Sequence, residues 1–575
     1  MKFYLPVVLL FIFSIPAILP LFQNDFPTTH DGVTHVVRFL RFDEALLDGQ
    51  FPPRWANGIA FNLGSPVLMF NAPLPYFAAE IPRLFGASYS FSIEIIFAFA
   101  FIASGIAMYF FLKDLFGYLP AFLGALLYIW APYRFIDLYV RGAYPEHFAF
   151  MSPQLILFSF KKIIEGGGRI WFFLGVLSIS GLILSHNVMF VLFGSVPILY
   201  SLILAWKLGK IRNYKLIFLS FTCAIFLTSF YLLPAFFEKS YTNLDKLITE
   251  PSFYNNFISI DKIIYSRWGW GPLSSDSPMS LQLGFAQWLT VLGSMILFLT
   301  SLRGVLRRSN LAFRKIAALT VFARHDRGVY FVIFFPLIVL SIFLMTSYSA
   351  FIWERIPLLA FFLYPWRFLS LAIFCVATLG AFLIYSLPNK FKKVAIFGFV
   401  VLLLYSNRNH LQLVGNISGD DSYYKSYTDT SDIWGEFLPR NANLDHVKKC
   451  KVEKCIYEKF DAPVGVEIKK IEETSKGLSV IYKSEMDFKG IINTYYFPGL
   501  SIYLDEKEIA SKVNELGTMG VELPRGEHNL VAKFKDTTLR KISNYISLST
   551  LIILFLYVAK IRYGENLFQK ISKKT

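Results

Sequence analysis

Apolar blocks recur along this chain, and most of them are close in length to a membrane-spanning helix. An α-helix needs roughly 20 residues to cross a hydrocarbon core about 30 Å thick. Hydrophobic residues make up 55% of the chain and charged residues 17%, with a mean hydropathy of +0.49, and a soluble domain cannot bury that much apolar surface. The sequence therefore predicts a polytopic α-helical membrane protein of about twelve spans. The predicted spans are Tyr4–Phe22, Ser90–Leu112, Tyr118–Trp130, His147–Phe160, Ile170–Leu184, Val188–Trp206, Leu216–Phe237, Trp288–Leu302, Val329–Thr346, Phe368–Leu387, Val394–Tyr405 and Ile542–Ala559.

The first apolar block has the length of either a signal peptide or a retained anchor. After Leu21 the chain reads FQNDFPTTHD, which has no small-residue cleavage pattern. We therefore expect the block to stay in the protein as its first span.

Lys and Arg gather in alternate connections between the predicted spans, which sets the expected orientation in a cell membrane. Short cytoplasmic loops carry the excess of positive charge, so these connections and both termini are predicted to be cytoplasmic. The net charge of +16 then reflects topology and contact with anionic lipid, and it gives no support to nucleic-acid binding. The basic residues concerned are Lys161, Lys162, Arg169, Lys207, Lys210, Arg212, Lys215, Arg303, Arg307, Arg308, Arg314, Lys315, Arg324, Arg327, Lys390, Lys392, Lys393 and the closing ISKKT.

This orientation places four segments outside the cell and divides the chain into domains. The external segments are a long first loop at 23–89, the loop Arg134–Glu146, the segment Glu238–Gln287 and the loop ending in YPWRF. Residues 1–405 form the predicted transmembrane domain, and 542–575 the last span with its basic tail. Between them, 406–541 has soluble composition, with alternating stretches such as GLSVIYK and NLVAKF, which predicts a small extracytoplasmic all-β sandwich.

Two cysteines stand close together in the predicted β domain, in CKVEKC. An extracytoplasmic position permits a disulfide between Cys450 and Cys455, and the alternative is a pair of free thiols. Cys223 and Cys375 fall inside predicted spans and are interpreted as packing residues.

Acids, imidazoles and guanidinium groups follow directly after the first span, in PTTHDGVTHVVRFLRF. At 100° per residue Asp31, His35 and Arg38 share one face of a predicted interfacial helix, opposite a stripe of valine and leucine that would rest on lipid or on neighbouring spans. This face is a candidate reaction site. The alternative for Asp31 is an N-cap whose carboxylate is occupied by backbone N–H groups.

Three further residues with polar chemistry lie together in VRGAYPEHF. Arg141, Glu146 and His147 bring a cation, a carboxylate and an imidazole to the outer end of a span. The alternative is a structural ion pair between Arg141 and Glu146 that holds the loop.

The other candidates lie singly at outer ends of spans or in the first external loop. Arg367 and Trp366 belong to YPWRF, where an interfacial anchor is the alternative. His186 precedes Asn187 in LSHNVMF, where a hairpin turn is the alternative. Arg54 belongs to PPRW and is either a site residue or a loop anchor.

Several of these motifs together resemble a known family. They look like motifs of the bacterial and archaeal integral-membrane family labelled "6-pyruvoyl-tetrahydropterin synthase-related". The motifs that carry the resemblance are THDGVTHVVRF, LLDGQFPPRW, NLGSPVLMFNAPLPYF, RGAYPEHFAF, SHN, YPWRFL, YYFPGLSIYLDEKE and VELPRGEHNL. That family is similar in architecture to the YfhO-like proteins and to the GT-C superfamily of polytopic glycosyltransferases. The likeness covers nearly the whole chain. Nothing in the sequence resembles a soluble zinc enzyme with a histidine triad, as the pterin-synthase label would suggest.

The resemblance implies transfer of a sugar from a polyprenyl-phosphate carrier to an extracytoplasmic acceptor, which would be a cell-envelope glycan, a lipid or a protein. In GT-C enzymes an acidic residue of the first external loop is the base or a metal ligand, and Asp31 matches that position. Many of those loops carry paired acids, whereas HDG offers one, so a requirement for Mg²⁺ or Mn²⁺ stays open.

The chemistry of this transfer assigns a role to each candidate residue. The acceptor oxygen must lose a proton and the leaving phosphate must be stabilised, tasks suited to a carboxylate and to guanidinium groups. We expect Asp31, His35 and Glu146 to be catalytic. The residues expected to bind phosphate are Arg38, Arg54, Arg141 and Arg367, and those expected to contact substrate are His30, His147, His186 and Trp366.

Two other functions remain open from the sequence. A transporter or flippase of lipid-linked glycans would place ionisable residues inside several spans, and few occur there. A non-catalytic envelope-assembly protein would bind glycan through its β domain.

Overall fold

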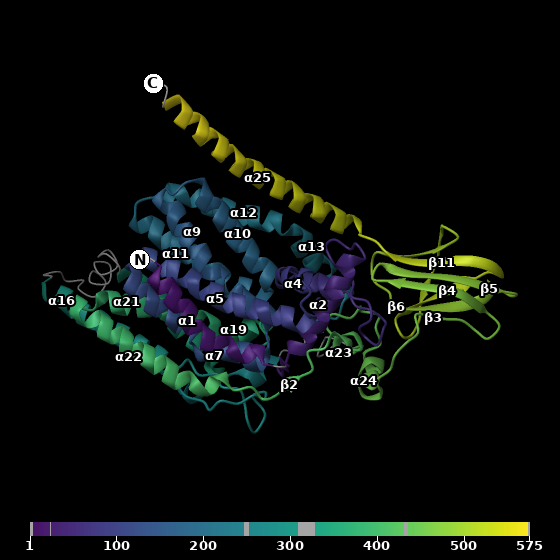
Figure 1. Cartoon of the computed structure of the whole chain (residues 1–575), viewed down its shortest axis with the longest axis horizontal. Helices are drawn as coiled ribbons and strands as arrows, with labels where there is room; N and C mark the ends of the chain where they lie inside the picture. Colours follow the sequence, from purple (N-terminus) through teal and green to yellow (C-terminus); the bar gives the residue numbers. More distant parts are fainter. Residues whose placement is uncertain (1–3, 24, 247–251, 309–327, 430–434, 573–575) are drawn as a thin grey trace.

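The computed structural model describes residues 4–23, 25–246, 252–308, 328–429 and 435–572. A helical bundle forms the larger part of the molecule, and a β domain projects from one end of it (Figure 1). Helix α1 begins and helix α25 ends at the opposite end of the bundle, so the two ends of the chain lie away from the β domain.

Apolar helices of different lengths build the bundle. These are α1 (Leu5–Ile18), α5 (Tyr89–Phe116), α6 (Tyr118–Ile129), α9 (Ser152–Glu165), α10 (Arg169–Ser185), α11 (Asn187–Lys207), α12 (Tyr214–Leu227), α13 (Ser229–Phe237), α16 (Phe285–Arg308), α18 (Gly328–Met345), α21 (Leu369–Ser386), α22 (Asn389–Asn407) and α25 (Thr538–Ser572). The other α-helices of the described residues are α2 (Gly32–Leu47), α3 (Val67–Phe70), α4 (Leu74–Leu84), α7 (Pro132–Phe135), α8 (Tyr144–Ala149), α15 (Ile260–Ile264), α19 (Ala350–Arg355), α20 (Pro357–Ala360), α23 (Asp421–Lys425) and α24 (Leu444–Glu453).

Within the described residues, seven helices are long and apolar enough to cross a membrane, or up to nine if each of two bent pairs counts as one span. The expectation of about twelve spans is therefore not confirmed. The prediction counted every apolar block as one straight span, and some blocks do not form one. Helix α9 is only 14 residues long, and the block Leu216–Phe237 is broken at Thr228, where the chain bends by 73°. The arrangement agrees with a multi-pass membrane protein.

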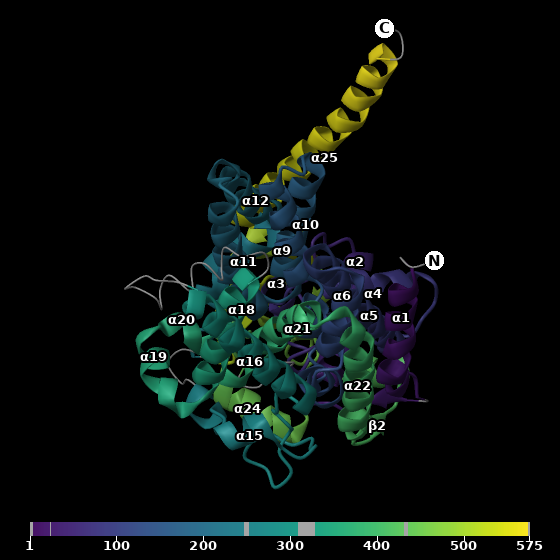
Figure 2. The same ribbon diagram turned by 90° about the vertical axis from the view of Figure 1, so that its left-hand side faces the viewer.

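Helix α21 is the centre of the bundle, surrounded by α5, α6, α16, α18 and α22 (Figure 2). Nearly every residue of this helix is buried, because its many small and aliphatic side chains let neighbouring helices approach on all sides. Helix α25 lies along one side against α12 and α13 and projects beyond them.

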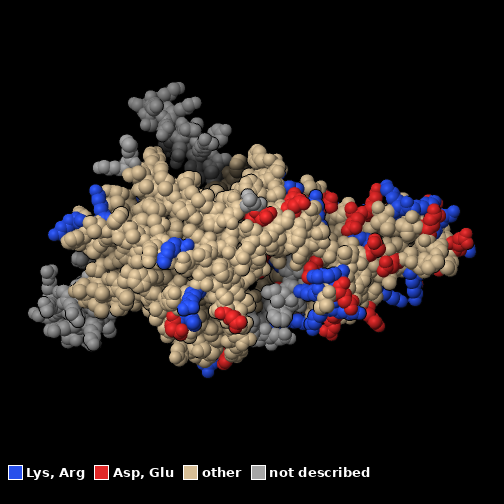
Figure 3. Space-filling view, turned by 60° about the horizontal axis from the view of Figure 1, so that its bottom comes forward, with Lys and Arg blue, Asp and Glu red and all other residues tan. Residues whose placement is uncertain are grey.

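The surface of the molecule is divided by charge. On the face shown in Figure 3, Lys, Arg, Asp and Glu are dense over the β domain and sparse over the helical bundle. Many large apolar side chains of α1, α11 and α22 are exposed, as expected of helices that face lipid. The basic stretch Arg303–Arg327, on which the orientation partly depends, lies outside the described side chains.

The second bent pair overturns one sequence expectation. The sequence predicts an external loop at Arg134–Glu146, but Pro132–Arg141 is helical, follows α6 at an angle of 47° and is buried. Its last part, Ile136–Arg141, is a π-helix, a local widening that often occurs at functional sites.

The β domain is a sandwich of two antiparallel sheets, as predicted. One sheet has the order β3-β6-β10-β9 and the other β4-β5-β11-β7-β8. Buried residues of both sheets, such as Ile492 and Val480, belong to one hydrophobic core. The strands are β3 (Phe460–Asp461), β4 (Glu467–Thr474), β5 (Gly477–Ser484), β6 (Phe488–Tyr495), β7 (Leu500–Leu504), β8 (Lys507–Ile509), β9 (Lys512–Val513), β10 (Thr518–Leu523) and β11 (Gly526–Phe534).

The sandwich begins at Phe460 and not at 406, because the described residues between these positions fold with the loop 23–89, the predicted first external loop. β1 (Phe26–Pro27) pairs with β2 (Asn416–Ile417). Helix α24 packs its buried face on the loop in a separate core, which also includes the end of β6. The members of this junction core are Trp55, Ala60, Phe61, Leu63, Met69, Phe70, Leu438, Ala442, Val447, Cys450, Tyr495 and Phe497.

Candidate active site

A cavity of about 560 Å³ opens where the bundle meets the junction core. Segments far apart in the sequence line it, among them the start of α2, the turn between η2 (Ile136–Arg141) and α8, the start of α11 and the segment before α21. The cavity brings together most of the residues predicted from the sequence. These are His30, Asp31, His35, Arg38, Arg141, Glu146, His186 and Arg367.

Asp31 occupies the N-cap position of α2, but its carboxylate does not cap the helix. The first free amide, that of Gly32, donates instead to Thr29 Oγ1 at 3.1 Å. Within the described residues the half-buried Asp31 carboxylate has no hydrogen bond and no ion pair. The carboxylate is therefore available to a ligand in the cavity.

The backbone around Asp31 is held against the η2–α8 turn. The amides of His30 and Asp31 donate to the carbonyl oxygens of Val140 and Arg141 at 2.9 and 2.8 Å. This approach requires glycine on both sides, because a Cβ atom at Gly32 or at Gly142 would overlap Thr29 Oγ1. The HDG motif (His30–Gly32) and the RGA motif (Arg141–Ala143) are therefore packed against each other through their backbones.

His35 and Arg38 follow Asp31 along the same face of α2. His35 Nδ1 lies 2.9 Å from the Tyr76 hydroxyl, and burial together with the nearby Arg38 lowers the pKa of His35 well below its usual value, so its ring is neutral. Arg38 Nη1 donates to Asn71 Oδ1 at 3.1 Å. The opposite face of α2 is also buried, against α4, α5 and α23, so the helix does not rest on lipid.

Glu146 is the centre of a buried ion-pair cluster beneath the cavity. Its Oε2 accepts from Arg141 Nη1 at 2.8 Å and lies 3.5 Å from Arg367 Nε, and its Oε1 accepts from the Tyr133 hydroxyl at 2.6 Å. Burial alone would raise the pKa of Glu146, but the charges of Arg141 and Arg367 outweigh burial and hold that pKa at about 2. Glu146 is fully occupied by these partners, so the structure favours the structural ion pair over a role as base.

The two arginines of this cluster still offer donors to the cavity. All hydrogen bonds of the Arg141 guanidinium to described residues use Nη1, which also contacts Asp137 at 2.7 Å. Arg367 uses Nη1 for the Phe362 carbonyl oxygen at 2.7 Å. Both residues line the cavity, so their remaining N–H groups can meet an anion there.

The two other histidines at the cavity have fixed roles. His186 caps α11, accepting the Met189 amide at Nδ1 at 3.1 Å, so Nε2 carries the proton of the neutral ring. Burial, with Arg367 and Arg141 nearby, lowers the pKa of His186 to about 3, although Glu146 opposes the shift. His30 Nε2 donates to the Trp270 carbonyl oxygen at 2.5 Å. His186 is therefore both a cap and a hydrogen-bond donor beside the cavity.

Three predicted site residues lie outside the cavity lining. His147 is buried behind the ion-pair cluster, 3.5 Å from Asp137 Oδ2. Trp366 is buried with its ring 4.9 Å from the Arg141 guanidinium, so it supports the cluster. Arg54 is buried beside Asp536 at 3.0 Å and joins the predicted first loop, 23–89, to the chain before α25, as a loop anchor would.

The sequence did not predict the residues that line the cavity from the junction side. Asp429, Glu436, Phe437 and Lys451 all belong to the stretch before the sandwich, which was assigned to the β domain. No local signal marks them, because they reach the cavity only through the packing of α24 on the loop 23–89.

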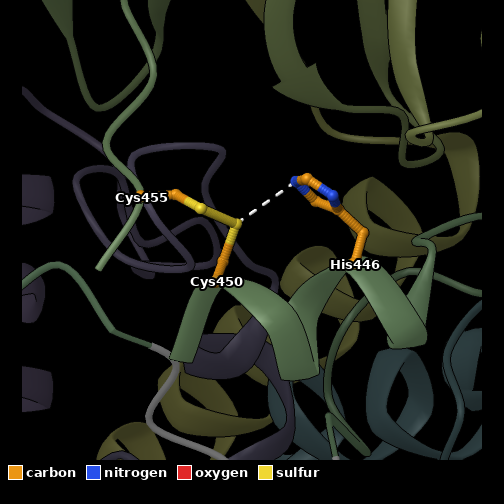
Figure 4. A group of neighbouring side chains, drawn as sticks. All are labelled: His446, Cys450 and Cys455. Atoms are coloured by element: carbon orange, nitrogen blue, oxygen red, sulfur yellow. Dashed lines mark hydrogen bonds between the residues drawn. A yellow bond between two sulfur atoms is a disulfide. The ribbon is translucent and has the colours of Figure 1, made fainter. Parts of the chain in front are cut away.

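Next to Lys451, Cys450 and Cys455 form a disulfide that closes the end of α24 (Figure 4). His446 Nε2 lies 3.2 Å from Cys450 Sγ. In the described chain these three residues form the one group of three His, Cys, Asp or Glu side chains whose ligand atoms lie within 4.8 Å of one another. Because disulfide sulfurs are not thiolates, the group does not suit a metal in this state. Asp31 belongs to no such group among the described residues.

Comparisons with protein-family models and with curated proteins found no match to this chain.

Proposed function

We propose that the protein is a membrane glycosyltransferase that moves a sugar from a polyprenyl-phosphate carrier to an acceptor outside the cytoplasm. The observation that carries this proposal is the unpartnered Asp31 carboxylate in the same cavity as Arg38, Arg141 and Arg367. The resemblance to the GT-C superfamily, with Asp31 at the position of its acidic loop residue, points the same way.

Each group has one task in this reaction. The acceptor hydroxyl oxygen attacks the anomeric carbon, the bond from that carbon to the phosphate oxygen breaks, and Asp31 takes the hydroxyl proton. Polyprenyl phosphate leaves with the bonding electrons. The arginines stabilise the negative charge that develops on the phosphate, because a planar guanidinium binds two phosphate oxygens at once.

The location of the cavity suits a lipid-borne phosphate. The cavity lies at the end of the apolar bundle next to the β domain, beyond the candidate span Asn187–Lys207, which starts directly after His186. A polyprenyl chain in the membrane would hold its phosphate at this boundary between apolar and charged surface. The apolar lining by Phe361, Leu363 and Phe437 would contact the first part of the polyprenyl chain.

A transporter of lipid-linked glycans is the second candidate, and one observation favours it. Arg134, Asp137 and His147 are fully buried inside the bundle, at a bent helix pair. Buried ionisable groups beside broken helices are common in transporters.

Sugar transfer by the purified full chain separates the two candidates. The protein in proteoliposomes is given a panel of radiolabelled polyprenyl-phosphate sugars and an extract of envelope acceptors. We expect release of free polyprenyl phosphate with label in the acceptor. Movement of an intact labelled carrier across the bilayer without its cleavage would instead support the transporter.

A further inference from the structure

A second cavity, of about 470 Å³, lies at the outer ends of α1 and α5, away from the candidate active site. Three parts of the chain form its walls: Phe22, Gln23, Asp25 and Phe26 after α1, the start of α5, and the stretch Ser418–Asp420 that follows β2. The walls are tied together, since β1 pairs with β2 and the Ser90 hydroxyl donates to the Gly419 carbonyl oxygen at 2.9 Å.

The lining of this cavity is strongly acidic. It includes the carboxylates of Asp25, Glu94 and Asp420, and none of its described lining residues is Lys, Arg or His. Hydroxyl groups of Ser88, Ser90 and Ser418 add further oxygen atoms. The α5 N-terminus is already capped by Ser88 and Asp421, so it does not attract an anion here.

Glu94 is the residue of this cavity that most strongly indicates a bound ligand. It is 5% exposed, yet within the described residues its carboxylate has no hydrogen bond and no ion pair. Its oxygen atoms are not among the fully enclosed unpaired atoms, so they face the cavity. A buried carboxylate without a partner is costly in its ionised form, so it either takes up a proton or is neutralised by a cation.

The geometry favours an organic cation over a metal ion. Calcium binds oxygen atoms at about 2.3–2.6 Å, so the carboxylates of one site must converge. These three do not form a group of ligand atoms within 4.8 Å. The cavity also carries three phenylalanine rings, and Phe22 and Phe91 stand edge to face at 6.1 Å. Aromatic faces attract ammonium groups.

We infer that this acidic cavity binds a primary ammonium group, carried by the ethanolamine headgroup of a neighbouring phospholipid. Phe22 and Phe91 are 41% and 44% exposed at the outer ends of two candidate spans, where lipid headgroups lie. The ammonium group donates its hydrogens to Glu94 and to the hydroxyl groups, while the acyl chains lie along the exposed apolar faces of α1 and α5. This site is independent of the proposed transfer reaction.

The test is lipid binding to the delipidated full chain, measured by native mass spectrometry with phosphatidylethanolamine, phosphatidylcholine and phosphatidylglycerol. We expect preference for phosphatidylethanolamine, and in Glu94→Gln a loss of affinity of roughly tenfold or more, because a buried charge loses its counterpart. Glu485→Gln, which removes an exposed charge on the β domain, is the matched control and should bind as the parent does. Asp25→Asn gives a second reading should Glu94→Gln fold poorly.

Several outcomes would overturn the inference. One is equal binding of the three lipids, and another is an unchanged affinity in both cavity variants. Glu94-dependent binding of free ethylammonium without binding of the lipid would assign the site to a soluble amine. Glu94-dependent terbium luminescence at micromolar concentration would assign it to a metal ion.

Discussion

Replacing Glu146 by Gln tests whether this residue holds the site together or takes part in the chemistry. Its carboxylate contacts Arg141 at 2.8 Å and Tyr133 at 2.6 Å, and it is not exposed to solvent. Removing one partner of a buried ion pair costs about 3–5 kcal/mol. Arg141 keeps Asp137 at 2.7 Å, so we expect the lower end, about 3 kcal/mol.

The pKa of Glu146 gives a second estimate of the same quantity. A pKa of about 2 against an ordinary value of 4.5 corresponds to on the order of 3 kcal/mol in favour of the ionised form. Because folding lowers this pKa, the stabilisation is complete above about pH 4.5 and is lost as the pH falls toward 2. The difference in unfolding temperature between parent and variant should therefore be full at pH 7 and shrink below pH 4.5.

Thermal unfolding in detergent, followed by tryptophan fluorescence, measures this effect. Asp31→Asn is the control, since its carboxylate has no described partner and its loss should leave the unfolding temperature unchanged. A Glu146→Gln variant that unfolds at the parent's temperature at pH 7 but fails to transfer sugar would refute the reasoning and make Glu146 the base.

Three further changes test the surroundings of the cavity. Lys451→Met should raise the KM for the carrier several-fold with a smaller effect on kcat, while Lys448→Met, on the exposed face of the same helix, should change neither. An equal effect of both would show that Lys451 acts only through overall charge. Replacing Cys450 and Cys455 by Ser should cost about 2 kcal/mol at most and increase proteolysis around α24, with the bundle unaffected. Arg54→Met should lower the unfolding temperature without changing carrier affinity, and weaker carrier binding would return Arg54 to the site.

Local sequence pattern could predict the part of the site that lies on one element. Asp31, His35 and Arg38 share a face because helical periodicity places them there, and Arg141 and Arg367 were found because both lie at ends of apolar blocks that are predicted to face outward. Lys451 could not be found in this way, because its position depends on α24 packing against a loop near the other end of the chain.

Local sequence pattern also predicted the fold only in part. Alternation of apolar residues predicted the sandwich, yet its start was placed too early, because residues 406–459 have soluble composition and the described part of this stretch forms none of its strands. Hydropathy also cannot distinguish a straight span from a bent one, so Leu216–Phe237 was counted as a single crossing although the chain turns by 73° within it.

The most direct test of the central claim is the rate of sugar transfer by Asp31→Asn compared with its affinity for the carrier phosphate. Asn has nearly the size of Asp but cannot accept the acceptor proton, so transfer should fall by about 10²- to 10⁴-fold. Binding of the carrier should stay close to that of the parent, because the arginines that hold the phosphate are unchanged. Transfer at the parent's rate would contradict the account, since Asp31 would then play no part in the chemistry of the cavity.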